Sequence, residues 1–150
     1  MRIDFYHLQN QTLEDVLPKL LTKAYSTGQK IVVKIGTPER VEFINTHLWT
    51  FEEGSFLPHG SKKDGNADLQ PIWLTCSEEI PNGASIMFWI DGAESNIDNL
   101  DSITRVLNIF DGNSEPALQQ ARRLWKELKS ASNEVYYWQQ DTSNRWLQKA

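Results

Sequence analysis

The chain has 150 residues, with 15 Lys and Arg against 20 Asp and Glu, for a net charge of −5. This length predicts one domain spanning residues 1–150, large enough to bury a core without cross-links. The single cysteine, Cys76, excludes an intramolecular disulfide and a CxxC metal or redox site. The negative charge means that any cationic function must be local. Because the sequence shows neither a signal peptide nor an apolar membrane-spanning run, we expect a cytoplasmic protein with no membrane contact.

The first two elements are predicted from periodicity and capping. Alternation over Arg2–Leu8 predicts a strand. Thr12-Leu-Glu-Asp15 predicts a helix start, because it offers a capping hydroxyl followed by acidic residues in the first turn. Apolar residues then recur at helical spacing as far as Gly28. Pro18 lies within this span and predicts a kink or a later start, because it lacks an N–H and its ring crowds the preceding turn.

The middle of the chain alternates strand and helix signals. Lys30–Ile35 is a β-branched run that predicts a buried strand, and Thr37-Pro38-Glu39 predicts the start of a second helix. Gln70–Cys76 and Ser85–Ile90 again have strand character. For Ile103–Phe110 the apolar pattern fits a strand or a short helix equally well.

The C-terminal part contains the most regular helical pattern. Ser114-Glu115-Pro116 predicts its N-terminus, and Glu134–Gln140 after it predicts a closing strand. Alternating strands and helices are typical of an α/β fold, here a mostly parallel sheet flanked by helices. Such a fold resembles mononucleotide-binding folds and raises the possibility of a phosphate site.

The usual phosphate-binding sequence is absent. The turn after the first strand, Gln9-Asn-Gln-Thr12, contains no glycine, and neither GxGxxG nor GxxxxGK[ST] occurs. His7, His47 and His59 lack metal-ligand spacing, and no GxSxG positions a serine nucleophile. We therefore predict no catalytic residue, no cofactor and no metal. A small α/β enzyme or nucleotide-binding protein acting on an anionic ligand is the alternative.

The last helix carries the clearest positive signal. Arg122, Lys126 and Lys129 follow the apolar arc on the side of Trp125, in a chain that is acidic overall. One interpretation is a solvated helix face whose cations suit the C-terminal end of the helix dipole. The other is a cationic groove with an aromatic wall, suited to an acidic peptide with a hydrophobic end. A further hypothesis is direct binding of single-stranded nucleic acid by these cations and stacked aromatics.

A second candidate is the aromatic region after the second helix. It comprises Trp49 and Phe51, then Phe56, Leu57, Pro58 and His59, with Gly54 and Gly60 leaving the backbone free to present them. These side chains either fold back onto the core or form an exposed patch that contacts a partner protein.

Several short motifs, in this order and spacing, resemble the chi subunit family of bacterial DNA polymerase III over nearly the whole chain. They are Phe5-Tyr6-His7-Leu8, Leu48-Trp49, Ser55-Phe56-Leu57-Pro58-His59, Gln70-Pro-Ile-Trp73, Phe110-Asp-Gly112, Ala121-Arg122, Trp125-Lys126 and Tyr137-Trp138-Gln-Gln140.

The resemblance implies a single α/β domain without nucleotide binding or catalysis, which joins a psi-type clamp-loader subunit to single-stranded DNA-binding protein (SSB), with DNA contacted only indirectly. It implies that the acidic, Phe-terminated SSB tail binds Arg122, Trp125, Lys126 and Lys129. A further basic residue of the family corresponds here to Leu118 or Gln119. The resemblance also implies that the psi-type subunit binds the region from Trp49 to His59. The contact residues there would be Trp49, Phe51, Phe56, Leu57, Pro58 and His59.

Overall fold

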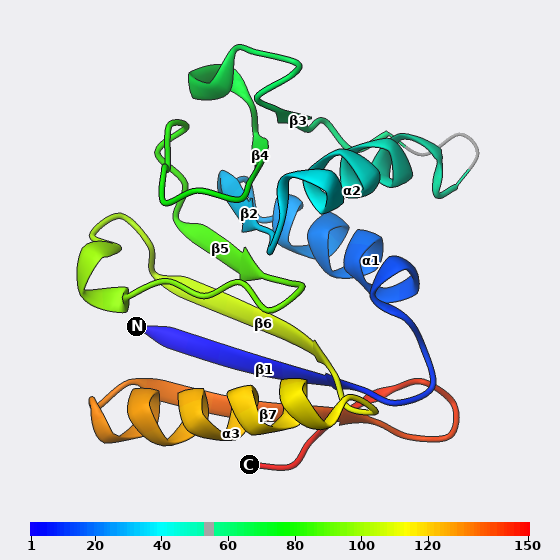
Figure 1. The fold of residues 1–150 in the computed structure, drawn as a ribbon, viewed down its shortest axis with the longest axis vertical. Helices are drawn as coiled ribbons and strands as arrows, with labels where there is room; N and C mark the ends of the chain where they lie inside the picture. Colours follow the sequence, from blue (N-terminus) through cyan, green and yellow to red (C-terminus); the bar gives the residue numbers. More distant parts are fainter. Residues whose placement is uncertain (53–55) are drawn as a thin grey trace.

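The computed structural model describes residues 1–52 and 56–150, within which eight strands form one sheet in the order β3-β4-β2-β5-β6-β1-β7-β8 (Figure 1). The strands are β1 (Arg2–Leu8), β2 (Ile31–Lys34), β3 (Gly60–Ser61), β4 (Ile72–Thr75), β5 (Ile86–Trp89), β6 (Arg105–Asp111), β7 (Glu134–Gln140) and β8 (Trp146–Gln148). Neighbouring strands pair in parallel except β7 and β8, which are antiparallel. The predicted α/β fold with a mostly parallel sheet is confirmed.

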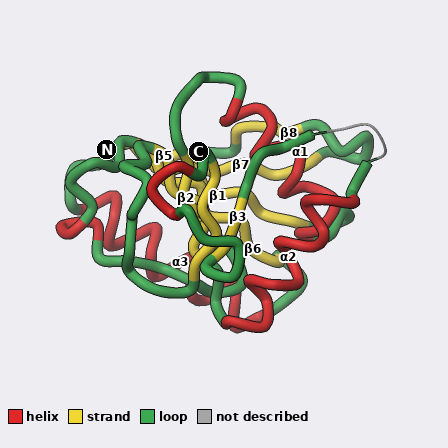
Figure 2. The backbone as a smooth tube through the Cα atoms, turned by 90° about the horizontal axis from the view of Figure 1, so that it is seen from above, coloured by secondary structure: helices red, strands yellow, loops and turns green. Residues whose placement is uncertain are grey.

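Helices cover both faces of this sheet. They are α1 (Leu13–Tyr25), α2 (Pro38–Thr50) and α3 (Glu115–Ser130), together with the short 3-10 helices η1 (Ala67–Leu69) and η2 (Ile97–Asn99). α1 and α2 lie on one side of the sheet and α3 on the other (Figure 2). Successive residues of β1 consequently enter different cores: Tyr6 packs with α1 and α2, whereas Phe5 packs with α3.

The first helix begins where its capping signal predicts. The Thr12 side chain accepts from the Asp15 N–H, and the Asp15 carboxylate accepts from the Thr12 N–H, so both halves of a capping box form. α1 runs through Pro18, so the later start allowed by that residue is excluded. Pro18 cannot donate to the carbonyl of Glu14; instead, His47 of α2 lies with Nε2 at 2.7 Å from that oxygen.

Most of the ambiguous run at residues 103–110 lies in the strand β6, which pairs with β5 on one side and β1 on the other. Two short strands were not predicted from the sequence. β3 has two residues and β8 has three, too few for a period to show in the sequence. Both lie at the sheet edges, where pairing with one neighbour is enough to define a strand.

Candidate functional site

The third helix separates buried and exposed side chains as its periodicity predicts. Ala121, Leu124 and Leu128 are buried against the sheet, and Ser114 caps the N-terminus by accepting from the Ala117 N–H. Trp125 is half-buried at the edge of this core, toward β7. The cations predicted beside it, Arg122, Lys126 and Lys129, are exposed.

Trp125 is held in place by other aromatic rings. Its ring centroid lies 5.6 Å from that of Phe5 and 5.8 Å from that of Tyr137, both in edge-to-face arrangements. Lys129 Nζ lies 5.2 Å from the Trp125 centroid, over the ring. We define the α3–β7 surface as Arg122, Trp125, Lys126, Lys129 and Tyr137.

The cationic side chains of α3 differ in whether they are paired with an acidic residue of the protein. Within the described part of the chain, the side chains of Arg122, Lys126 and Lys129 make no hydrogen bond or ion pair. Arg123, by contrast, donates to Glu94 at 2.7 Å and to Glu127 at 3.2 Å. Arg123 is therefore engaged within the protein, whereas its neighbour Arg122 is available to an external anion.

Tyr137 is a member of this surface that the sequence did not single out as a site residue. Its hydroxyl lies 2.6 Å from His7 Nδ1. Burial raises the pKa of the Tyr137 hydroxyl, and the positive charge of Arg122 partly opposes that rise. Strand alternation places Tyr137 on one face of β7, but only the parallel pairing of β7 with β1 shows that this face adjoins α3.

Below this surface, the backbone at Gly112 passes directly against the His7 ring. A Cβ atom at position 112 would overlap that ring and approach the Leu8 carbonyl oxygen to 2.5 Å. The His7 ring also packs on Phe110, with centroids 5.2 Å apart. Glycine at this turn therefore allows the loop before α3 to close over the end of β1.

The second predicted surface is divided between exterior and core. Trp49 and Phe56 are 46% and 74% exposed, and their ring centroids are 6.0 Å apart. Leu57 and His59 are only 2% and 3% exposed, so the expectation that they form part of an outward patch does not hold. Phe51 and Pro58 are partly buried, and Gly54 lies outside the described residues. What faces outward is the Trp49–Phe56 pair.

The reason for this division is local. The His59 ring lies with Nδ1 at 2.6 Å from the Leu57 carbonyl oxygen and Nε2 at 2.9 Å from that of Asn45, which ties the segment to α2. Trp49 covers His59, with the ring centroids 4.1 Å apart. Leu57 joins the core shared by α1 and α2. Leu57 and His59 thus anchor the segment that carries Phe56.

In a sheet of this kind a nucleotide would bind at the switch point, where β1 and β6 are neighbours whose following helices cover opposite faces. A hollow of about 410 Å³ lies there. Its charged lining comprises Glu14, Asp91 and Asp111 with one cation, Arg40, which donates to both Glu14 and Asp91 at 2.9 Å. The α1 N-terminus at its rim is occupied by the capping box. This lining suits a phosphate poorly.

Two features are absent from the described residues. Among residues 1–52 and 56–150, no three His, Cys, Asp or Glu side chains gather in a way that could hold a metal ion. In the same part of the chain, no helix has the length and apolar character needed to cross a membrane.

Comparison with known proteins identifies the family. The chain is similar to the probable DNA polymerase III subunit chi of Rickettsia prowazekii (strain Madrid E), with 28% identity over 109 residues. That match covers 73% of this chain and 65% of the relative, so it spans slightly less than two thirds of the relative's length. A family model described as DNA polymerase III chi subunit, HolC, matches residues 1–135. Since this match includes most of the sheet and all three helices, the chain belongs to the DNA polymerase III chi subunit (HolC) family.

Proposed function

We propose that this protein is a non-catalytic accessory subunit of DNA polymerase III in the cytoplasm, which binds the acidic tail of SSB on the α3–β7 surface and a psi-type clamp-loader subunit at the Trp49–Phe56 pair. Membership of the chi family supports a role as an accessory subunit in replication. The two binding assignments rest on the chemistry of the two surfaces. They lie on helices covering opposite faces of the sheet, so one molecule can hold both partners together.

The observation that carries the first assignment is the contrast between Arg122 and Arg123. Adjacent residues of one helix differ in that Arg123 is paired with two glutamates, whereas Arg122, Lys126 and Lys129 meet no anion in the described structure. Lys129 lies over the half-buried ring of Trp125, and Arg122 lies about one helical turn before that ring on α3. Several free cations beside an aromatic wall fit a ligand with carboxylates and a terminal aromatic ring.

The decisive measurement is calorimetric binding of a peptide ending Asp-Ile-Pro-Phe. Lys126→Glu should weaken binding by roughly 1.5–3 kcal/mol, which is about ten- to a hundredfold, because it replaces a charge-assisted hydrogen bond with repulsion. Lys126 is exposed, so the variant should keep its fold, which circular dichroism can verify.

The matched pair Arg122→Ala and Arg123→Ala provides the control. Each removes one positive charge from the same turn of α3, but only Arg122 is available to a ligand. The peptide should lose affinity for Arg122→Ala and keep it for Arg123→Ala. Equal losses would show that binding responds to net charge alone, and wild-type affinity for Lys126→Glu would refute the site.

For the second assignment, the exposed ring of Phe56 is the expected anchor for the psi-type subunit, with Trp49 beside it. Large aromatic side chains that remain exposed in the free protein are characteristic of interface anchors. Phe56→Ala should abolish capture of that subunit in a pull-down while tail-peptide binding continues unchanged. Normal capture by Phe56→Ala would exclude the assignment.

A further inference from the structure

A third surface lies on the side of β7 that faces away from α3, and neither proposed partner occupies it. A hollow of about 290 Å³ opens there between the end of α1 and the sheet. Its apolar floor includes Leu20, Ala24 and Leu107, and its walls include the indoles of Trp138 and Trp146. The charged side chains that line it are Arg2, Lys23 and Arg105, all cations.

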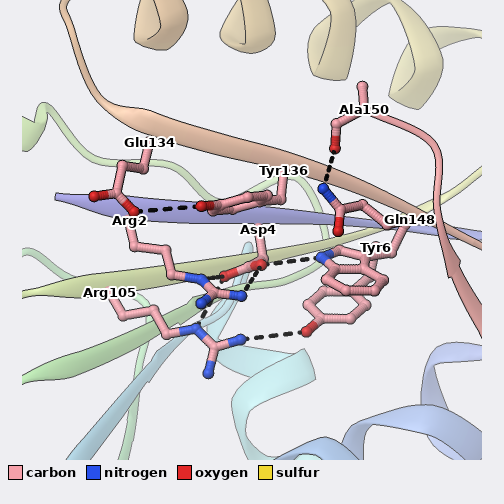
Figure 3. Close-up of polar contacts among 9 residues, drawn as sticks. Arg2, Asp4, Tyr6, Arg105, Glu134, Tyr136, Gln148 and Ala150 are labelled. Atoms are coloured by element: carbon pink, nitrogen blue, oxygen red, sulfur yellow. Dashed lines mark hydrogen bonds and ion pairs between the residues drawn. The ribbon is translucent and has the colours of Figure 1, made fainter.

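The two arginines are fixed by a buried carboxylate (Figure 3). Asp4 is fully buried and accepts from Arg2 Nε at 3.0 Å, from Arg105 Nε at 2.9 Å and from Trp138 Nε1 at 2.9 Å. Burial alone would raise the pKa of Asp4, but the hydrogen bonds from Arg2 and Trp138 and the charge of Arg105 lower it below its usual value. Asp4 therefore remains ionised and orients both guanidinium groups.

One carboxylate does not neutralise this group of cations. Arg2, Arg105 and Lys23 carry three positive charges against the single charge of Asp4. Arg2 uses Nε and Nη2 toward Asp4, and Arg105 uses Nε toward Asp4 and Nη2 toward the Tyr6 hydroxyl. Among the described residues, the Nη1 atom of neither arginine has a hydrogen-bond partner. The hollow thus presents guanidinium donors and net positive charge in a protein of net charge −5.

The aromatic walls are equally preorganised. Trp138 stacks parallel to Tyr6, with centroids 6.3 Å apart and an interplanar angle of 11°. Trp146 meets Tyr6 edge to face at 4.9 Å. Both indoles remain half-buried, so each retains exposed ring area beside the cations. Flat apolar faces next to guanidinium groups suit a ligand that combines a planar ring with a phosphate.

We propose that this hollow, bounded by Arg2, Lys23, Arg105, Trp138 and Trp146, binds one nucleotide unit of single-stranded DNA, with the phosphate on the cations and the base against the indoles. Its volume is small enough to select a single base-sized group. Duplex DNA keeps its base faces stacked inside the helix, so only a single strand offers a base to the indoles. An accessory subunit of a replicative polymerase would thereby touch the strand directly as well as through protein partners.

The test is fluorescence anisotropy of a labelled oligothymidylate at low salt. Lys23 is exposed and makes no ion pair in the described structure, so Lys23→Glu should fold normally and weaken binding roughly five- to tenfold, the effect of losing about one phosphate contact. Trp146→Ala should weaken binding by roughly tenfold, within the range for loss of one base–aromatic stack. Melting curves of both variants verify that the fold is retained.

One control variant and two competitors complete the design. Lys63→Glu makes the same charge change at the distant α2–β4 edge and should bind like wild type. Free thymidine monophosphate should displace the oligonucleotide only at much higher concentration, because it lacks the flanking phosphates. The acidic Phe-ended peptide should not displace it.

Three results would overturn the proposal. The first is absence of oligonucleotide binding at low salt, and the second is equal binding by wild type and Lys23→Glu. The third is loss of binding in Lys126→Glu alone, which would move the strand to the α3–β7 surface. Because the peptide assay is separate, failure here leaves the proposed SSB contact intact, and failure of that contact leaves this site intact.

Discussion

The sequence predicts protein-binding residues both on the α3–β7 surface and in the segment 56–59, yet the two regions are built differently. On α3, regular helical geometry keeps the buried and exposed side chains on separate faces, and the exposed cations stay together. In the segment 56–59, the backbone is irregular, and adjacent residues point in opposite directions: Phe56 outward and Leu57 into the core. A helical face can therefore act as one surface, whereas this segment supplies a single anchor.

The two regions also differ in the force that each offers to a partner. The α3–β7 surface combines charge with a partly buried ring, so attraction acts at a distance and is screened by salt. The Trp49–Phe56 pair offers exposed aromatic area, which acts only on contact. Under the proposed function, the first surface would attract an acidic tail from a distance, and the second would form an apolar interface on contact.

The largest expected effect distinguishes the two neighbours in the irregular segment. Leu57→Ala should cost about 2–5 kcal/mol of folding stability, because it removes a fully packed side chain and leaves a cavity. Phe56→Ala should change stability by no more than about 0.5 kcal/mol, because the ring is mostly exposed. Urea denaturation of both variants measures the difference. Similar stability losses would show that Phe56 also belongs to the core.

The sequence predicts α3 well because a period of 3.6 residues fixes which side chains share a face. The strands β1 and β7 are recognisable for a similar reason, whereas the apolar run 103–110, which contains most of β6, fits a strand or a helix until its neighbours in the sheet are known. No such rule exists for irregular backbone, so the opposite directions of Phe56 and Leu57 could not be derived. The bond between His47 and the Glu14 carbonyl likewise depends on how α2 packs against α1.

The candidate site shows the same limit at the level of single residues. The cations on α3 could be placed from periodicity, but their availability could not, because it depends on Glu94 pairing with Arg123 from a distant loop. Tyr137 could be assigned to a strand, but its contact with Trp125 follows from the order of strands in the sheet. Long-range pairing of this kind leaves no trace in local sequence pattern.

An intermediate effect should appear in the response of the two surfaces to salt. Raising the ionic strength from about 0.1 to about 1 M shortens the Debye length from about 10 to about 3 Å. Tail-peptide affinity should then fall roughly fivefold, because salt screens the attraction between the three exposed cations and the carboxylates of the peptide. Association through the Trp49–Phe56 pair should persist. Calorimetry at both salt concentrations tests this, and an equal loss at both surfaces would contradict the distinction between them.

The smallest expected effect concerns His7, which lies beneath the α3–β7 surface. Burial lowers the pKa of His7 below its ordinary value of 6.5, and the charge of Asp111 only partly opposes this. Below about pH 6.5 the unfolded chain therefore binds a proton that the folded chain resists, so folding stability should fall as the pH drops through this range. Above it, both states are neutral at His7 and the effect vanishes.

A comparison of wild type with His7→Gln isolates that contribution. His47 and His59 are present in both proteins, so the difference between the two proteins reports on position 7. Between about pH 7.5 and pH 5.5, spanning the ordinary histidine pKa, wild type should lose more stability in urea denaturation than the variant. The Tyr137 hydroxyl gives a second readout, because its hydrogen bond to His7 Nδ1 should change when His7 gains a proton. The Tyr137 ring also contacts Trp125, so the change is made next to the α3–β7 surface. Parallel pH profiles, or a wild type that loses less stability than His7→Gln on acidification, would show that His7 is not held neutral by the fold.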